Sequence, residues 1–267
     1  GLPASKPPPK TKPLNLISVM STHRKDIYVA SSTHKHLLNS IEVGDLELAK
    51  RLLIGVDINA QNNRGITALY KSVFHNRESL VHLLLKQGAD TNLPDHEGLT
   101  PLHVTALEDL DKLIPSLLDK GAELEAKDSY GYTPLHLATD QGNTKTARTL
   151  IERGANVNNR ADWDTTPLQS SIIRGSSKLV KLLLKIGADI TAKDRLGRSA
   201  LHWAAEKGHL SMAKFLILNG ALIHHQDNEG HTPLHEAARW DQQKMIRLLI
   251  FHGVNVNTKG VDGRTPL

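Results

Sequence analysis

Residues 131–138 read GYTPLHLA, and residues 230–237 read GHTPLHEA. The same phrase recurs every 33 residues, in the forms GITALY (65), GLTPLH (98), DTTPLQ (164), GRSALH (197) and GRTPL (263). A second glycine follows 23 residues after the start of each of the first six phrases, from Gly88 to Gly253. A period held over most of a chain indicates that it is built from one repeated structural unit.

Each phrase predicts the start of a helix. Thr133 and its equivalents stand where a hydroxyl caps the first backbone N–H groups, and Pro134 follows where a missing N–H costs nothing. Apolar residues such as Leu179 and Leu183 then recur at the spacing of a second helix, which a glycine such as Gly187 ends. Asp, Asn and Gly residues favour a turn after that glycine. One unit is therefore a helix, a turn, a second helix and a projecting turn segment, called the finger below.

A single unit leaves apolar helix faces uncovered, so the units are predicted to stack into an all-α repeat solenoid. The period of 33 and the TPLHxA phrase resemble the ankyrin repeat family. The period predicts six helix-turn-helix-finger units over 65–262 and a truncated unit at 263–267. The first unit, at 32–64, lacks the opening phrase and is predicted to be a cap unit; units are numbered below with this cap as the first. The resemblance implies a concave surface of fingers and first helices that binds protein partners. We expect a location in the cytoplasm or nucleus.

Charge is unevenly distributed along the chain. Its 267 residues include 33 Lys and Arg against 28 Asp and Glu, a net charge of +5. Residues 1–31 carry +4 of this and hold five of the twelve prolines, so they are predicted to be a disordered basic tail. The remainder carries +1, which predicts that the solenoid has no broad basic face. Residues 97–129 are acidic and residues 163–195 basic, which fits either a partner of complementary polarity or solvated outer faces.

The basic tail leaves a second hypothesis open, in which the protein binds an anion, either nucleic acid or an acidic membrane, through residues 1–31. Catalysis is not predicted, because the sequence has no cysteine, no phosphate-binding glycine loop and no GxSxG or HExxH motif. Four histidines share one place in the phrase, where the resemblance implies a hydrogen bond to the Thr hydroxyl: His103, His136, His202 and His235. The histidine runs at 34–36 and 224–225 lack metal-ligand spacing. We therefore expect no cofactor, no metal and no small-molecule substrate.

The ten aromatic residues indicate where a partner would bind. By resemblance, the fingers and the last turns of the first helices face the groove, and half of the aromatics fall there: Phe74, Tyr130, Tyr132, Trp163 and Trp240. Three further residues are predicted to contact the partner beside them: Ile173, Arg174 and Arg198. Exposed Trp and Tyr are frequent anchors of interfaces. The alternative for Tyr130 and Tyr132 is that they brace adjacent fingers. Phe215 and Phe251 are expected in core positions.

Four departures from the pattern carry expectations of their own. Pro115 falls inside the predicted second helix of the third unit and should bend it, at a cost of up to about 3 kcal/mol. Thr146 and Ala147 replace large apolar residues, so the fourth unit should have the thinnest core. Asp164 replaces a glycine, which predicts an altered fingertip at Trp163. Asn158 matches the position that an asparaginyl oxygenase hydroxylates in proteins resembling this one.

These observations predict a non-enzymatic interaction module. It would act as a scaffold, an adaptor, an inhibitor or the substrate-recognition arm of a larger enzyme such as a ubiquitin ligase.

Overall fold

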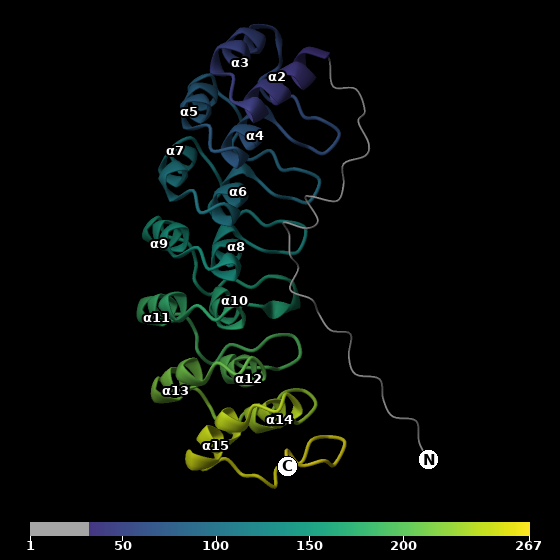
Figure 1. The fold of residues 1–267 in the computed structure, drawn as a ribbon, viewed down its shortest axis with the longest axis vertical. Helices are drawn as coiled ribbons and strands as arrows, with labels where there is room; N and C mark the ends of the chain where they lie inside the picture. Colours follow the sequence, from purple (N-terminus) through teal and green to yellow (C-terminus); the bar gives the residue numbers. More distant parts are fainter. Residues whose placement is uncertain (1–31) are drawn as a thin grey trace, which may run out of the picture.

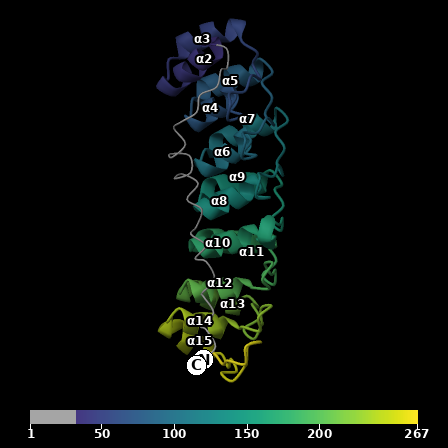
Figure 2. The same ribbon diagram turned by 90° about the vertical axis from the view of Figure 1, so that its right-hand side faces the viewer.

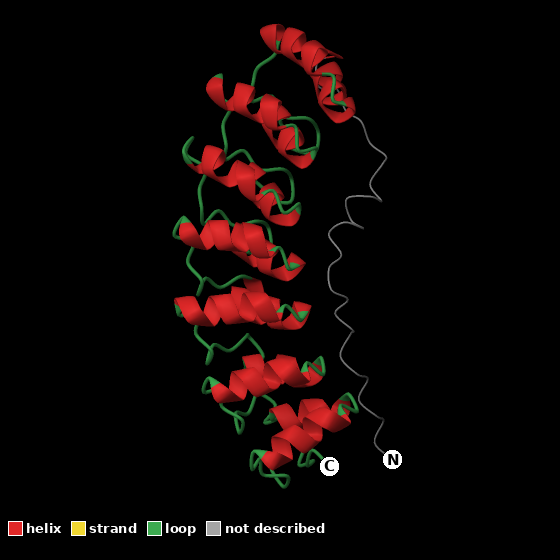
Figure 3. Ribbon diagram, turned by 60° about the vertical axis from the view of Figure 1, so that its left-hand side comes forward, coloured by secondary structure: helices red, strands yellow, loops and turns green. Residues whose placement is uncertain are grey.

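The computed structural model describes residues 32–267, and the predicted tail at residues 1–31 lies outside them. The described residues form 14 α-helices and no strand. Figure 1 shows the helices in pairs stacked along one long axis, with the fingers projecting on one side. Figure 2 shows the same pairs as successive layers, and Figure 3 shows that the stack is curved. The predicted all-α solenoid is confirmed.

The first helix of each pair lies in the inner layer, next to the fingers (Figure 1). The inner helices are α2 (Ser32–Val43), α4 (Ala68–Phe74), α6 (Pro101–Leu107), α8 (Pro134–Gln141), α10 (Pro167–Arg174), α12 (Ala200–Glu206) and α14 (Pro233–Arg239). The outer helices are α3 (Leu46–Leu52), α5 (Glu78–Lys86), α7 (Ile114–Leu118), α9 (Thr144–Glu152), α11 (Ser177–Ile186), α13 (Leu210–Leu218) and α15 (Gln243–Phe251). Three short 3-10 turns complete the helical content: η1 (Leu53–Gly55), η2 (Asp111–Leu113) and η3 (Asp162–Asp164).

The inner helices begin at the repeated phrase because the phrase supplies a complete cap. Thr133 accepts from the backbone at the third helical position, and His136 Nδ1 accepts from the Thr133 backbone N–H at 3.2 Å. The opposite ring atom, Nε2, lies 3.1 Å from the carbonyl oxygen of Thr165 in the next finger. Because Nδ1 accepts, the Nε2–H donates, so one neutral imidazole both starts a helix and joins two units.

The core lies between the two helical layers and continues from unit to unit. It consists of Leu, Val, Ile and Ala side chains of both layers, such as Leu135, Leu150, Leu179 and Leu183, each no more than 1% exposed. The buried residues of all units form one cluster, so each unit relies on its neighbours to cover its apolar faces.

The sequence predicted Pro115 in the interior of the outer helix, whereas the structure places it at the start of that helix. The 3-10 turn η2 ends at Leu113, and α7 begins at Ile114, so Pro115 occupies the first turn of a shortened helix. The N–H that proline lacks would have no partner within α7 at this position. The expected bend and its cost of about 3 kcal/mol are therefore absent, and the unit has a five-residue outer helix instead.

The outer helix of the fourth unit has the small core residues that the sequence indicates. Thr146 and Ala147 are both fully buried, in the slots that Leu179 and Val180 fill in α11. The Thr146 hydroxyl donates to the carboxylate of Asp109 in the preceding unit, at 2.9 Å. This hydrogen bond satisfies the buried hydroxyl but adds no apolar area.

One aromatic prediction is wrong. Phe251 is 85% exposed at the end of α15, whereas the sequence placed it in the core. Phe215 is half-buried and packs against the core as expected. Within residues 32–267, no helix combines the length and the apolar character needed to cross a membrane.

Candidate protein-binding surface

Hydrogen bonds between consecutive fingers fix the positions of their tips. The backbone N–H of Asp162 donates to the Tyr130 carbonyl at 2.9 Å, and the backbone N–H of Arg195 donates to the Trp163 carbonyl at 2.8 Å. Within a finger, Asp128 Oδ1 accepts from the N–H groups of Tyr130 and Tyr132, at 2.9 and 2.8 Å. The tips therefore form a regular ladder along one side of the stack.

Three consecutive tips carry large apolar side chains. Tyr130, Trp163 and Leu196 are 45%, 62% and 48% exposed, and they stand 33 residues apart in the same slot. The tips on either side are charged, Glu97 before them and Glu229 after. We call Tyr130, Trp163 and Leu196 the apolar ridge. Tyr130 and Trp163 were predicted from the sequence, whereas Leu196 was not, although it occupies the equivalent slot of the next finger.

The tip at Trp163 is altered as the missing glycine predicted. Trp163 and Asp164 both have left-handed backbone conformations, with φ of 65° and 57°, and the tip forms the 3-10 turn η3. Gly131, the equivalent of Asp164, has a φ of 70°, and a Cβ there would lie 2.8 Å from the Asp162 carboxylate. The guanidinium of Arg195 in the next finger lies 5.8 Å from the Trp163 ring. This contact orients the indole while leaving most of it exposed.

Tyr132 differs from its neighbour Tyr130. Its ring is half-buried and meets the edge of the His136 ring at 5.6 Å, and its carbonyl accepts from His103 Nε2 at 3.0 Å. Burial raises the pKa of the Tyr132 hydroxyl above its ordinary value. Tyr132 thus braces the stack, which is the alternative that the sequence left open, whereas Tyr130 presents an exposed ring.

The inner helix ends supply the other predicted contact residues. Ile173 is half-buried and Arg174 is exposed. Both lie at the C-terminal end of α10, the helix that follows the Trp163 finger in the chain. Phe74 is half-buried at the end of α4, where its ring meets His75 edge-on at 5.2 Å. Trp240 is 48% exposed just after α14. In Figure 1, α4 lies near one end of the stack and α14 near the other, so these two do not join the central group.

Arg198 is engaged by its own chain. Its guanidinium lies 3.0 Å from Asp194 and 3.5 Å from Glu206, and it stacks 3.6 Å from the centre of the Trp203 ring. Lys207 adds a second ion pair to Glu206, at 2.8 Å. This arrangement ties the Arg198 guanidinium to two side chains of α12, Glu206 and Trp203. Arg198 therefore has fewer N–H groups available to a partner than the exposed Arg174.

The four repeated histidines have the structural role that the resemblance implied. Each Nδ1 lies 2.8–2.9 Å from the hydroxyl of its capping Thr or Ser, and each Nε2 faces a carbonyl of the next finger. Burial lowers the pKa of His103, His136 and His202 to about 4. They are neutral at physiological pH, and their two nitrogens are occupied.

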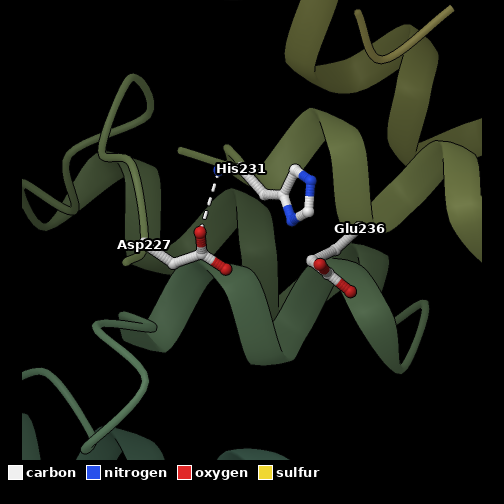
Figure 4. A group of neighbouring side chains, drawn as sticks. All are labelled: Asp227, His231 and Glu236. Atoms are coloured by element: carbon white, nitrogen blue, oxygen red, sulfur yellow. Dashed lines mark hydrogen bonds between the residues drawn. The ribbon is translucent and has the colours of Figure 1, made fainter. Parts of the chain in front are cut away.

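One further group has metal-binding residue types. Ligand atoms of Asp227, His231 and Glu236 lie within 4.8 Å of one another (Figure 4). Arg239 already supplies a positive charge there, 3.4 Å from both Glu236 Oε1 and His231 Nδ1. Asp227 Oδ1 also accepts from the His231 backbone N–H at 2.8 Å. The group is therefore an ion-pair network that joins a finger to α14.

The side chain of Asn158 links two units. Its Nδ2 donates to the Gly187 carbonyl at 3.2 Å, and its Oδ1 accepts from the backbone N–H of Asp189 at 2.8 Å. Asn92 makes the same two bonds to Gly121 and Glu123, both at 2.8 Å. Hydroxylation of Asn158 stays a prediction.

Comparison with known proteins agrees with this geometry. The family model for ankyrin repeats (3 copies) matches residues 37–128, 107–194 and 186–260. The chain therefore belongs to the ankyrin repeat family. It is similar to the crystal structure of the ankyrin repeat domain of Bcl-3, a member of the IkappaB protein family. The two share 29% identity with a TM-score of 0.68, over 76% of this chain and 93% of that one. No curated protein sequence matches the chain.

Proposed function

We propose that this protein is a non-enzymatic scaffold or adaptor that captures a protein partner on the apolar ridge and the adjoining inner helix ends. Ankyrin repeats are generally protein–protein interaction modules, which supports the proposal at the level of the class. We also propose that the protein is located in the cytoplasm or the nucleus.

The apolar ridge is the observation that carries the proposal. Three large apolar side chains lie exposed on adjacent, hydrogen-bonded fingers, although solvent exposure of such groups is unfavourable. Exposed large apolar side chains grouped in this way are typical of interaction sites, and Trp is among the residues that contribute most to binding. The exposed cations Arg174 and Arg195 lie on neighbouring elements, so a partner segment combining apolar and acidic side chains would fit.

Substitution of the central tip tests the proposal. A partner is first identified by affinity capture with the wild-type chain, and its dissociation constant is then measured for wild type and Trp163→Ala. We expect a loss of at least about 2 kcal/mol, close to 30-fold, because the indole is the largest exposed group of the ridge. Leu222→Ala is the matched control, since Leu222 is 59% exposed but lies off the ridge. Equal affinity of wild type and Trp163→Ala for the partner would contradict the proposal.

A further inference from the structure

The outer helices of the second half of the stack carry a strong positive charge. Helices α9, α11, α13 and α15 contain eight basic residues and one acidic residue, Glu152, a net charge of +7. The basic residues are all exposed: Lys145, Arg148, Lys178, Lys181, Lys185, Lys214, Lys244 and Arg247. The inner helices α8, α10, α12 and α14 carry two basic and three acidic residues. The expectation of a solenoid without a broad basic face is therefore wrong, because the two layers have opposite charge.

Four of these cations form a row in register across the helices. Arg148, Lys181, Lys214 and Arg247 stand 33 residues apart, one on each of the four outer helices. Neighbouring helices pack about 10 Å apart, so the row extends over about 30 Å. No carboxylate of residues 32–267 forms an ion pair with any of the four. We call these residues the basic row.

The outer helices of the first half differ. Helices α3 and α5 contain Lys50, Arg51 and Lys86 together with Glu47 and Glu78, and Lys50 is paired with Glu47 at 2.8 Å. The positive surface is therefore specific to the second half of the stack, not a property of every outer helix.

The basic row ends beside an apolar groove. A groove of about 440 Å³ lies between α13 and α15, lined by Leu210, Leu218, Leu248 and Phe251, with Lys214, Lys244 and Arg247 around it. Leu218 and Phe251 are 81% and 85% exposed. They occupy the same slot one unit apart, and Leu218 is exposed although a further helix pair follows it. This position of the repeat therefore faces solvent in both units, so the exposure of Phe251 does not arise from its place in the last helix.

From this pairing of charge and groove we infer that the outer face of α9–α15 is a second docking surface, which binds an acidic peptide segment bearing a large apolar side chain. The carboxylates lie along the basic row, and the apolar side chain enters the groove. An extended segment of about nine residues covers 30 Å. The fingers and the outer helices lie on opposite sides of the inner layer (Figure 1), so both docking surfaces can be occupied together.

Two features favour a peptide over other anions. The groove takes an apolar side chain, which the phosphate backbone of a nucleic acid does not offer. The outer helices also form the convex side of the stack (Figure 1), which a flexible chain can follow, whereas a flat bilayer touches only its crest.

Binding of a synthetic peptide tests the inference. The probe is a fluorescent peptide of about twelve residues that alternates Asp or Glu with Leu and Phe, and its binding to the chain is followed by anisotropy. We expect saturable binding that weakens as salt is raised from about 50 to about 500 mM. Reversing the charge of all four residues of the basic row (Arg148→Glu, Lys181→Glu, Lys214→Glu, Arg247→Glu) should weaken peptide binding at least tenfold. Phe251→Ser with Leu218→Ser should weaken it about tenfold without removing the salt dependence.

Matched controls separate this surface from general electrostatics. Reversing Lys50, Lys86 and Lys112 to Glu changes the charge of the first half and should leave peptide binding within about twofold. Circular dichroism checks that each variant folds. If the variant with four Glu substitutions unfolds, the double variant Lys181→Gln with Lys214→Gln is measured in its place. Absence of peptide binding, equal losses in the two reversal variants, or tighter binding to duplex DNA or to phosphatidylserine vesicles than to the peptide would each overturn the inference.

Discussion

At the scale of single residues, one histidine position explains much of the order of the stack. His136 closes the cap of its own helix and reaches the Thr165 carbonyl of the next finger. In the fifth unit Gln169 stands in the position of this histidine and makes equivalent hydrogen bonds. Its Oε1 accepts from the Thr166 backbone N–H at 2.9 Å, and its Nε2 donates to the Arg198 carbonyl at 3.3 Å. The slot requires one acceptor and one donor on a planar side chain.

This equivalence predicts the effect of two substitutions. His136→Gln should lower the free energy of unfolding by less than about 1 kcal/mol, because the amide can make both bonds. His136→Leu should lower it by about 2 to 4 kcal/mol, because a buried N–H and a carbonyl lose their partners. Urea denaturation of the two variants measures the difference, and equal losses would show that the hydrogen bonds contribute little.

The same histidines predict how stability depends on pH. Their pKa values are about 4 in the folded chain, against 6.5 for an ordinary histidine. The unfolded state therefore binds more protons between these values, and protonation draws the equilibrium toward it. The contribution of these three histidines to stability should be complete above about pH 6.5 and decrease as the pH is lowered toward 4. Urea midpoints measured across this range check the direction, and a midpoint that rises on acidification would contradict it.

At the scale of helices, the outer helix of the third unit shows what periodicity can and cannot predict. The apolar spacing placed a helix around Pro115 correctly but put the proline in its interior, whereas α7 begins only at Ile114. The boundary depended on whether residues 111–113 continue an α-helix or form a 3-10 turn, and apolar spacing does not distinguish these two.

The position of Pro115 makes its replacement mild. Pro115→Ala should change the free energy of unfolding by less than about 1 kcal/mol in either direction, because no intrahelical hydrogen bond is missing in the first turn. A proline inside a helix would instead give a gain of about 3 kcal/mol on replacement. Thermal or urea unfolding of the variant decides between these values.

The outer helix of the fourth unit should be the first to open. Thr146 and Ala147 bury less apolar area than Leu179 and Val180 in the next unit, and stability in a solenoid is shared only between neighbours. Hydrogen exchange of α9 should therefore be faster than that of α11 and α13. Uniform protection across the fourth and sixth units would contradict this expectation.

At the scale of the whole molecule, the sequence predicted the repeat architecture because every unit carries the same caps and apolar slots. It predicted part of the binding surface for the same reason, since Tyr130 and Trp163 occupy recognisable finger positions. Leu196 was not predicted because a leucine is more often a core residue, and only its finger slot distinguishes it from the many buried leucines. The basic outer face was missed because charge counted by unit averages an acidic inner layer with a basic outer one.

Crosslinking from the fingertips tests the central claim, that the apolar ridge contacts the protein partner. A photoreactive phenylalanine is placed at Tyr130, at Leu196 and, as a control, at Leu222, and the crosslinked partner is identified by mass spectrometry. We predict that the two ridge positions crosslink to the same protein and that Leu222 does not. Crosslinks from Leu222 without any from Tyr130 or Leu196 would contradict the account.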